Sequence, residues 1–175
     1  MRARSGIWYA TKVRYQKTME DGCEKVVTEQ YLIDALSFTE AENAIIDEMS
    51  VYVSGELKVS NLGQANFKEV FFSDVDDDDK WYKAKLQFIT IDEKSEKEKR
   101  SNVNYLVQAK SLARALRYID EVMGKTMIDY DVVMGKTMID YDVVGLNETK
   151  LHDVFEHHAP SDKNEEKNDD KEEAK

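Results

Sequence analysis

The stretch 8–15, WYATKVRY, and the stretch 81–88, WYKAKLQF, decide the fold of this 175-residue chain. Both begin with Trp-Tyr, and both then alternate apolar and polar side chains with a period of two. This period is typical of a β-strand whose two faces meet different surroundings. The stretches lie 73 residues apart, so the sequence indicates an internal repeat.

Further pairs of segments support the repeat. The segment EKVVTEQYLIDALSFTEA at 24–41 resembles EKRSNVNYLVQAKSLARA at 98–115, with a spacing of 74. Val-Phe at 70–71 recurs at 154–155, where the spacing has grown to 84. An exact tandem copy accounts for the excess of eleven residues, because VMGKTMIDYDV occurs twice within 122–143. We therefore interpret one copy as an insertion into an older repeat.

The periodicities predict an α+β fold made of two repeated β-β-α-β(-β) units, with a mostly antiparallel sheet and the helices on one face. A capping box, Ser37 to Glu40, predicts that the first helix runs to about Met49. The predicted units are residues 1–75 and 76–160. The predicted strands are at 8–16, 26–34, 55–62, 66–72, 81–91, 102–109 and 141–146, and the second helix is at 111–123.

The doubled segment raises two questions, about nucleotide binding and about folding. Its Gly-Lys-Thr resembles the end of a phosphate-binding loop, but that motif needs a glycine five residues earlier, where this chain has Ile119 and Tyr130. An odd insertion would exchange the faces of a strand, whereas eleven residues add about three helical turns. We expect one YDVV to form the native strand and the other copy to extend the helix or form a loop.

Composition limits the class of protein. The net charge is −11, and no run of 18 apolar residues could span a membrane. No apolar segment follows the basic N-terminus, and the single cysteine, Cys23, excludes a disulfide within the chain. We predict a cytoplasmic protein. The segment 161–175 has Ala174 as its single apolar residue, so we expect a disordered acidic tail.

Metal and catalytic motifs are weak. Asp74, Asp76 and Asp78 have the spacing of the first ligands of a calcium loop, but Asp79 and Lys85 replace its glycine and glutamate. An exposed acidic connection is the favoured interpretation, and weak cation binding is the alternative. The three histidines, His152, His157 and His158, are interpreted as solvated. We predict no metal, no cofactor, no catalytic residue and no enzymatic activity.

One face of the predicted strands carries the candidate binding residues. Aromatic and basic groups on a sheet surface can stack bases and hold phosphates, so this face is suited to single-stranded nucleic acid. The favoured interpretation, however, is that the tryptophans cap the sheet or bury a seam between the units while the lysines are solvated. A face that binds a protein is the third interpretation. The candidate residues are Trp8, Lys12, Arg14, Gln30, Trp81, Lys83, Lys85 and Asn104.

Several separated motifs resemble a known family. These motifs are YLIDALSFTEAE at 31–42, FITIDEKSEKEKR at 88–100, YLVQA at 105–109 and the closing LNET…DVF within 146–155. They resemble a domain-of-unknown-function family (DUF 4494) of Bacteroides-type bacteria and their phages. The resemblance covers roughly residues 7–157. It implies a soluble protein, compatible with carriage by phages or mobile elements, and it supplies no activity or catalytic residues.

Together these features predict a small non-enzymatic binding or adaptor protein with a protein partner. Two alternatives stay open. The first is a single-stranded nucleic-acid-binding protein that uses the aromatic and basic sheet face. The second is a phage protein that sequesters or blocks a host factor, for which an acidic surface is suitable.

Overall fold

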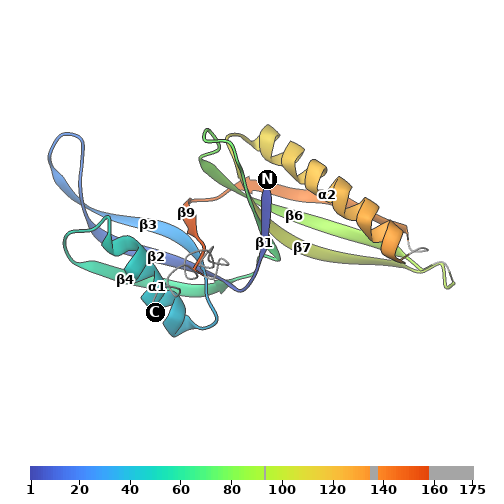
Figure 1. The fold of residues 1–175 in the computed structure, drawn as a ribbon, viewed down its shortest axis with the longest axis horizontal. Coiled ribbons are helices and arrows are strands. Elements are labelled where there is room, and N and C mark those ends of the chain that lie inside the picture. Colours follow the sequence, from blue (N-terminus) through green and yellow to red (C-terminus); the bar gives the residue numbers. More distant parts are fainter. Residues whose placement is uncertain (93, 135–137, 158–175) are drawn as a thin grey trace, which may run out of the picture.

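The structure, a computed structural model, describes residues 1–92, 94–134 and 138–157, with side chains left out at 127–134 and 138–139. Two helices and nine strands lie in the described part of the chain (Figure 1). The helices are α1 Phe38–Ser50 and α2 Leu112–Met134. The strands are β1 Arg2–Ser5, β2 Trp8–Thr18, β3 Glu24–Asp34, β4 Leu57–Ala65, β5 Glu69–Phe72, β6 Lys80–Ile91, β7 Glu98–Ala109, β8 Met138–Glu148 and β9 Leu151–Phe155.

The strands form two mixed sheets, so the α+β class is confirmed. One sheet has the order β4-β2-β3-β9, and the other has the order β1-β5-β7-β6-β8. Each is built on a long hairpin, β2–β3 or β6–β7, and a strand that follows the helix pairs with the hairpin's first strand. The prediction of a single sheet with both helices on one face needs correction, because there are two sheets and each carries its own helix. Of the seven strand pairings in the described residues, five are antiparallel and two are parallel.

Each sheet contains a short strand from the other half of the sequence, and these two strands, β5 and β9, are called the exchanged strands below. Strand β5 pairs in parallel with β7, with Val70 opposite Leu106. Strand β9 pairs in parallel with β3, with Val154 opposite Leu32. Strand β1 then pairs with β5, so the predicted boundary after residue 75 divides the sequence but does not divide the sheets. Parallel pairing is possible here because a long connection returns each short strand to the sheet.

The helix α1 forms where the capping box predicts. The Ser37 hydroxyl accepts the N–H of Glu40 at 3.1 Å, and the Glu40 carboxylate accepts the N–H of Leu36 at 3.0 Å. The bond to Ser37 satisfies an N–H group that the first helical turn leaves without an intrahelical partner, and the bond to Glu40 holds the residue that precedes the cap. The helix buries one stripe against β2, β3 and β4, which comprises Ala41, Ala44, Ile45 and Met49.

A tryptophan seam joins the two sheets. Trp8 is 1% exposed and Trp81 is 2% exposed, and both lie in one apolar cluster. Phe72 meets the Trp81 ring edge-on, with ring centroids 5.5 Å apart. The other members of this cluster are Leu32, Val70, Leu106 and Val154, which come from the parallel strand pairs. The exchanged strands therefore cover the tryptophans, which form the seam that the favoured interpretation of the sequence predicts and are not exposed for stacking against bases.

The doubled segment takes two conformations. The first copy, 122–132, lies entirely within α2, and the second copy ends in β8. The six residues MIDYDV are therefore helical at 127–132 and extended at 138–143. Identical letters have identical propensities, so tertiary context decides between the two states. For the second copy, that context includes the pairing of β8 with β6, in which Val143 lies opposite Leu86.

The tail predicted to be disordered, 161–175, lies outside the described residues.

Removing residues 133–143 should preserve the fold. Deletion of either copy gives the same sequence, in which the remaining copy must supply the first half of β8. We expect α2 to end near Met123 and residues 127–132 to become extended. The free energy of unfolding should change by no more than about 1 kcal/mol, since loop-closure entropy depends weakly on length. Urea unfolding and NMR secondary shifts of Ile128 and Tyr130 would test this, and an unfolded variant or a persistent helix at 127–132 would contradict it.

Candidate functional site

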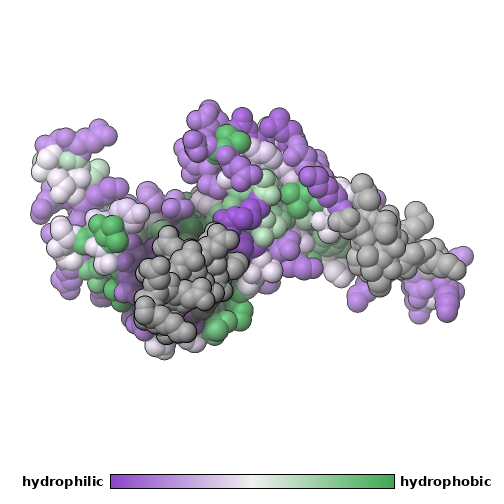
Figure 2. Space-filling view, viewed as in Figure 1, coloured by the Kyte–Doolittle hydropathy of each residue, from purple (hydrophilic) through white to green (hydrophobic). Residues whose placement is uncertain are grey.

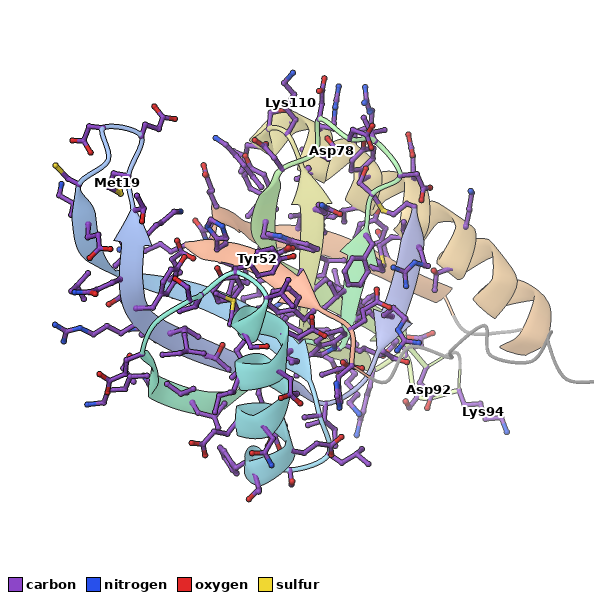
Figure 3. The ribbon with its side chains drawn as sticks, turned by 60° about the vertical axis from the view of Figure 1, so that its left-hand side comes forward. Met19, Tyr52, Asp78, Asp92, Lys94 and Lys110 are labelled. Carbon is purple, nitrogen blue, oxygen red and sulfur yellow. The ribbon has the colours of Figure 1, made fainter. Side chains whose placement is uncertain are left out.

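A polar and aromatic pocket of about 540 Å³ lies beside the C-terminal end of α1. Its walls come from β2, β3, β9, the end of α1 and the segment that follows the helix. Figure 3 labels Tyr52, which lies in this following segment, and Met19, which lies at the tip of the β2–β3 hairpin. The lining residues are Tyr15, Gln16, Lys17, Thr18, Glu29, Tyr31, Met49, Tyr52, Ser54, His152, Asp153 and Phe155.

The pocket exists because the helix is shorter than the strands it covers. Helix α1 has 13 residues, and strands β2 and β3 have 11 residues each. At about 1.5 Å per helical residue and about 3.4 Å per strand residue, the helix spans roughly 20 Å of strands that extend over more than 30 Å. The side chains beyond Met49 that face the helix layer are therefore left partly open.

Glu29 is the central charged group of the pocket. Its Oε2 atom accepts a hydrogen bond from the Tyr15 hydroxyl at 3.0 Å and another from the Tyr31 hydroxyl. Its Oε1 atom accepts from the Lys17 ammonium at 3.3 Å. The Glu29 side chain is 13% exposed, so the network lies mostly out of water.

This network fixes the protonation state of the pocket. Burial opposes ionisation of Glu29, but hydrogen bonds from Tyr31 and Tyr15, with the nearby His152 and Lys17, outweigh it and lower the pKa of Glu29. Burial and the Glu29 carboxylate raise the pKa of Tyr15 to about 12 and also raise the pKa of Tyr31. At neutral pH the site is a fixed carboxylate held by two protonated phenols.

Aromatic rings form the wall next to this carboxylate. The Tyr31 and Phe155 rings are stacked, with centroids 5.3 Å apart and planes 20° apart. The His152 ring meets Tyr31 edge-on at 5.4 Å. The parallel pairing of β9 with β3 brings Phe155 and His152 to the pocket, because it sets Asp153 opposite Tyr31.

The corresponding place in the second sheet has the same framework, with apolar residues at the positions of Glu29 and Tyr15. There Phe71 stacks on Tyr105, with centroids 5.4 Å apart. In the first hairpin Glu29 lies opposite Val13, whereas in the second hairpin Val103 lies opposite Leu86. Phe88 similarly occupies the position of Tyr15, and Val103 and Phe88 pack against an apolar core. The fold therefore does not require the carboxylate and the phenol that the first sheet carries.

The residues predicted as a binding face are only partly available. Lys12, Arg14, Lys83 and Lys85 are exposed. Gln30 and Asn104 are half-buried, and each lies opposite a lysine of its hairpin, Lys12 and Lys85 respectively. With both tryptophans buried in the seam, these groups form basic sheet surfaces that lack the predicted tryptophan stacking platform.

The acidic connection has a structural role at Asp78, which is buried rather than exposed as predicted. Its carboxylate accepts hydrogen bonds from the Ser73 hydroxyl, the Lys110 N–H at 2.8 Å, Arg114 Nη1 at 2.9 Å and the Tyr118 hydroxyl at 2.7 Å. Figure 3 shows Asp78 and Lys110 side by side. Asp78 therefore ties the connection to the first turns of α2.

The other carboxylates of the connection do not join Asp78. Asp74 accepts a hydrogen bond from the N-terminal amine at 2.6 Å, and Asp77 lies 3.5 Å from the Lys110 ammonium. Within the described residues, no group of three or more His, Cys, Asp or Glu side chains is placed to hold a metal ion.

A second concave surface is apolar. It lies between α2 and β8, encloses about 630 Å³, and is lined by Leu112, Ala113, Leu116, Val143, Val144, Gly145 and Leu146. Strand β8 is an edge of its sheet. The face shown in Figure 2 is mostly hydrophilic, with its hydrophobic residues in small separate patches.

Comparison with known families gives one match. A family model described as "Domain of unknown function (DUF4494)" matches residues 7–134. The chain belongs to the DUF4494 family. The matched range includes β2 through β7 with both helices, and therefore every wall of the Glu29 pocket except β9, while β8 and β9 lie beyond it.

The other comparisons add no relative to this DUF4494 chain. Neither the curated proteins nor the solved structures contain a significant match. Across the residues that the structure describes, no helix combines the length and apolar character needed to cross a membrane.

Sequence reasoning missed most of the Glu29 pocket. The strand period places Glu29 and Tyr31 on one face, but the contribution of His152 and Phe155 depends on the long-range pairing of β9 with β3. The sequence did contain one signal for this pocket. When the two hairpins are aligned, Glu29 lies at the position that an apolar residue, Val103, occupies in the second hairpin.

Replacing Asp78 with asparagine should destabilise the fold by about 3 kcal/mol at pH 7, because the buried network loses its negative charge and one of its two acceptor oxygens, and the new amide NH2 faces other donors. Burial opposes ionisation of Asp78, but its hydrogen bonds outweigh burial and lower its pKa. The stability difference between wild type and variant should therefore be full above about pH 4, the unfolded-state value, and shrink as pH falls through the folded pKa. Urea unfolding from pH 2 to 7 measures this. Asp77→Asn, at an exposed position, is the control, and equal effects of both substitutions would contradict the assignment.

The double variant Tyr15→Phe with Glu29→Val should be as stable as wild type, or more stable by about 1 kcal/mol, because apolar groups often replace a buried polar network without loss. At these two positions the double variant gives the first hairpin the same residue types, phenylalanine and valine, that the second hairpin has at the corresponding positions. Thermal unfolding measures the change. The reverse control, Val103→Glu, should cost about 2–4 kcal/mol because it buries a carboxylate in an apolar core. Strong destabilisation by the double variant would show that Glu29 serves stability.

Proposed function

We propose that this DUF4494 protein is a small non-enzymatic binding or adaptor protein that holds a protein partner at the Glu29 pocket. One observation carries the proposal. Of two corresponding places in the two sheets, one is filled by Val103 and Phe88, and the other holds an ionised carboxylate in an open pocket. Stability alone favours the apolar filling, so the polar filling points to a role in recognition.

The protonation states favour binding over acid–base catalysis. A general acid or base works best with a pKa near the working pH. The pKa of Glu29 is lowered, and the pKa of Tyr15 is raised to about 12, so neither exchanges protons readily at neutral pH. A fixed charge with fixed hydrogen bonds is suited to orienting a bound group.

We further propose that the two halves derive from one unit that was duplicated. The hairpins correspond in register, each begins with a buried tryptophan, and each contributes a tyrosine to a stacked aromatic pair. On this proposal, the second half keeps the structural form of the unit, and the Glu29 pocket is a specialisation of the first half. The tandem copy within 122–143 is a later addition.

The alternatives are less well supported. Binding of single-stranded nucleic acid would rely on Lys12, Arg14, Lys83 and Lys85 without tryptophan stacking, and the net charge of −11 opposes it. Sequestering or blocking a host factor is a form of the proposed protein binding, and it would suit carriage by phages of Bacteroides-type bacteria. We place the protein in the cytoplasm as part of the same proposal.

A site-specific crosslink tests the proposal. A photoreactive phenylalanine analogue at Tyr52, which is 72% exposed at the pocket, should capture a protein from a lysate of the source cells. Capture should disappear in the Tyr15→Phe, Glu29→Val background and should survive nuclease treatment. The same analogue at Val144 in the apolar groove is the control. Capture only from Val144 would move the interface to the groove, and loss of capture after nuclease would favour nucleic acid.

A further inference from the structure

One oxygen of the Glu29 carboxylate, Oε1, can accept more hydrogen bonds than it receives. Tyr15 and Tyr31 both donate to Oε2, whereas Oε1 receives only the Lys17 ammonium among the hydrogen bonds of the described residues. A carboxylate oxygen can accept about two hydrogen bonds. The Lys17 bond is long, at 3.3 Å, and its side chain is 45% exposed, so this contact contributes little and is readily exchanged.

The lining of the pocket around Glu29 suits a positive charge. Asp153 provides a second carboxylate on the pocket lining, and its residue lies opposite Tyr31 in the strand pairing. Aromatic rings attract cations through the negative potential of their faces. Tyr31, Phe155 and Tyr52 line the same pocket, and Tyr52 is largely exposed.

The charged groups that face the pocket favour a cation over an anion as its ligand. Its ionisable lining groups are Glu29, Asp153, Lys17, His152 and the tyrosines. An anion would meet both carboxylates, one of which is mostly buried and cannot move away. A cation at Oε1 would displace the exposed Lys17, whose present position shows that an ammonium group reaches this oxygen. The net charge of −11 also favours the approach of positively charged partners.

From this geometry we infer that the pocket binds an organic cation, the guanidinium or ammonium group of a basic side chain that the protein partner presents. The inference rests on the proposed function and specifies its chemistry. A guanidinium group suits the site best, because its planar fork can donate to Oε1 while its face lies on an aromatic ring. Lys17 then acts as an internal competitor that occupies the cation position when the partner is absent.

An NMR titration of the full chain tests this inference. The probes are N-acetyl-arginine methylamide and N-acetyl-citrulline methylamide, which have nearly the same shape but differ in charge. We expect saturable shifts of Tyr52 and His152 signals with the arginine probe, and about tenfold weaker binding of the citrulline probe, the effect of roughly one charge-assisted hydrogen bond. Equal binding of the two probes, or no saturable binding of either, would overturn the inference.

Two substitutions with opposite expected effects on arginine binding, together with one control substitution, test the charge of the ligand. Glu29→Gln should weaken arginine binding about tenfold, while Glu24→Gln, an exposed position on the same strand, should leave it unchanged. Lys17→Ala should strengthen arginine binding, because it removes the competitor, whereas an anion site would lose affinity. Thermal unfolding of each variant shows whether the fold is kept. Weaker arginine binding in a folded Lys17→Ala variant would overturn the inference.

Two experimental outcomes distinguish a failure of this inference from a failure of the proposed function. If the Tyr52 crosslink captures a protein in a Glu29-dependent manner but the arginine probe does not bind, the cation chemistry fails and the proposed function stands. If spermidine binds much more tightly than the arginine probe and no protein is captured, a free polyamine is the ligand and the protein partner is overturned.

Discussion

The reciprocal exchange of β5 and β9 is the constraint on which the rest of the structure depends. Each short strand leaves its own half of the sequence and pairs in parallel with the hairpin of the other half. The exchange places Val70 and Val154 against the tryptophans that begin the two hairpins, and the resulting seam is the apolar contact that joins the sheets. It also carries Phe155 and His152 to the wall of the Glu29 pocket, so the same pairing that unites the molecule completes its candidate site.

The two sheets share one framework but differ in the side chains that surround their stacked aromatic pairs. Stacked pairs, Tyr31 with Phe155 and Phe71 with Tyr105, occupy corresponding places beneath the two helices. Around the second pair Val103 and Phe88 pack against an apolar core, whereas around the first pair Glu29 accepts hydrogen bonds from two phenols and a lysine. A partly buried carboxylate carries a desolvation cost, which its hydrogen bonds offset only in part. Positions at which a charged group is buried despite this desolvation cost are commonly binding or catalytic sites.

Local patterns in the sequence were enough to predict the long strands of both hairpins, α1 with its capping box and the first part of α2. Their periods and caps are encoded within a few residues, as Ser37 and Glu40 illustrate. The arrangement of the sheets could not be predicted, because the parallel pairings join residues more than thirty positions apart and leave no periodic trace. The same limit explains the tryptophans: a period of two shows that Trp8 and Lys12 share a face, but not that β9 and β5 supply an apolar cover at one end of it. Asp78 looked like part of an acidic run because its partners, Arg114 and Tyr118, come from a helix distant in sequence.

The exchanged strands also bear on how such a molecule could arise. A single unit on its own would leave its terminal short strand without a sheet, and two identical units could satisfy each other by swapping these strands, as in a domain-swapped homodimer. Joining the two units in one chain, as the proposed duplication implies, would turn that dimer into a monomer with two surfaces that no longer need to be identical. Symmetry would then cease to constrain the side chains, and one half could acquire the Glu29 network while the other kept Val103. On this view, the asymmetry between the sheets is a freedom that a symmetric dimer does not have.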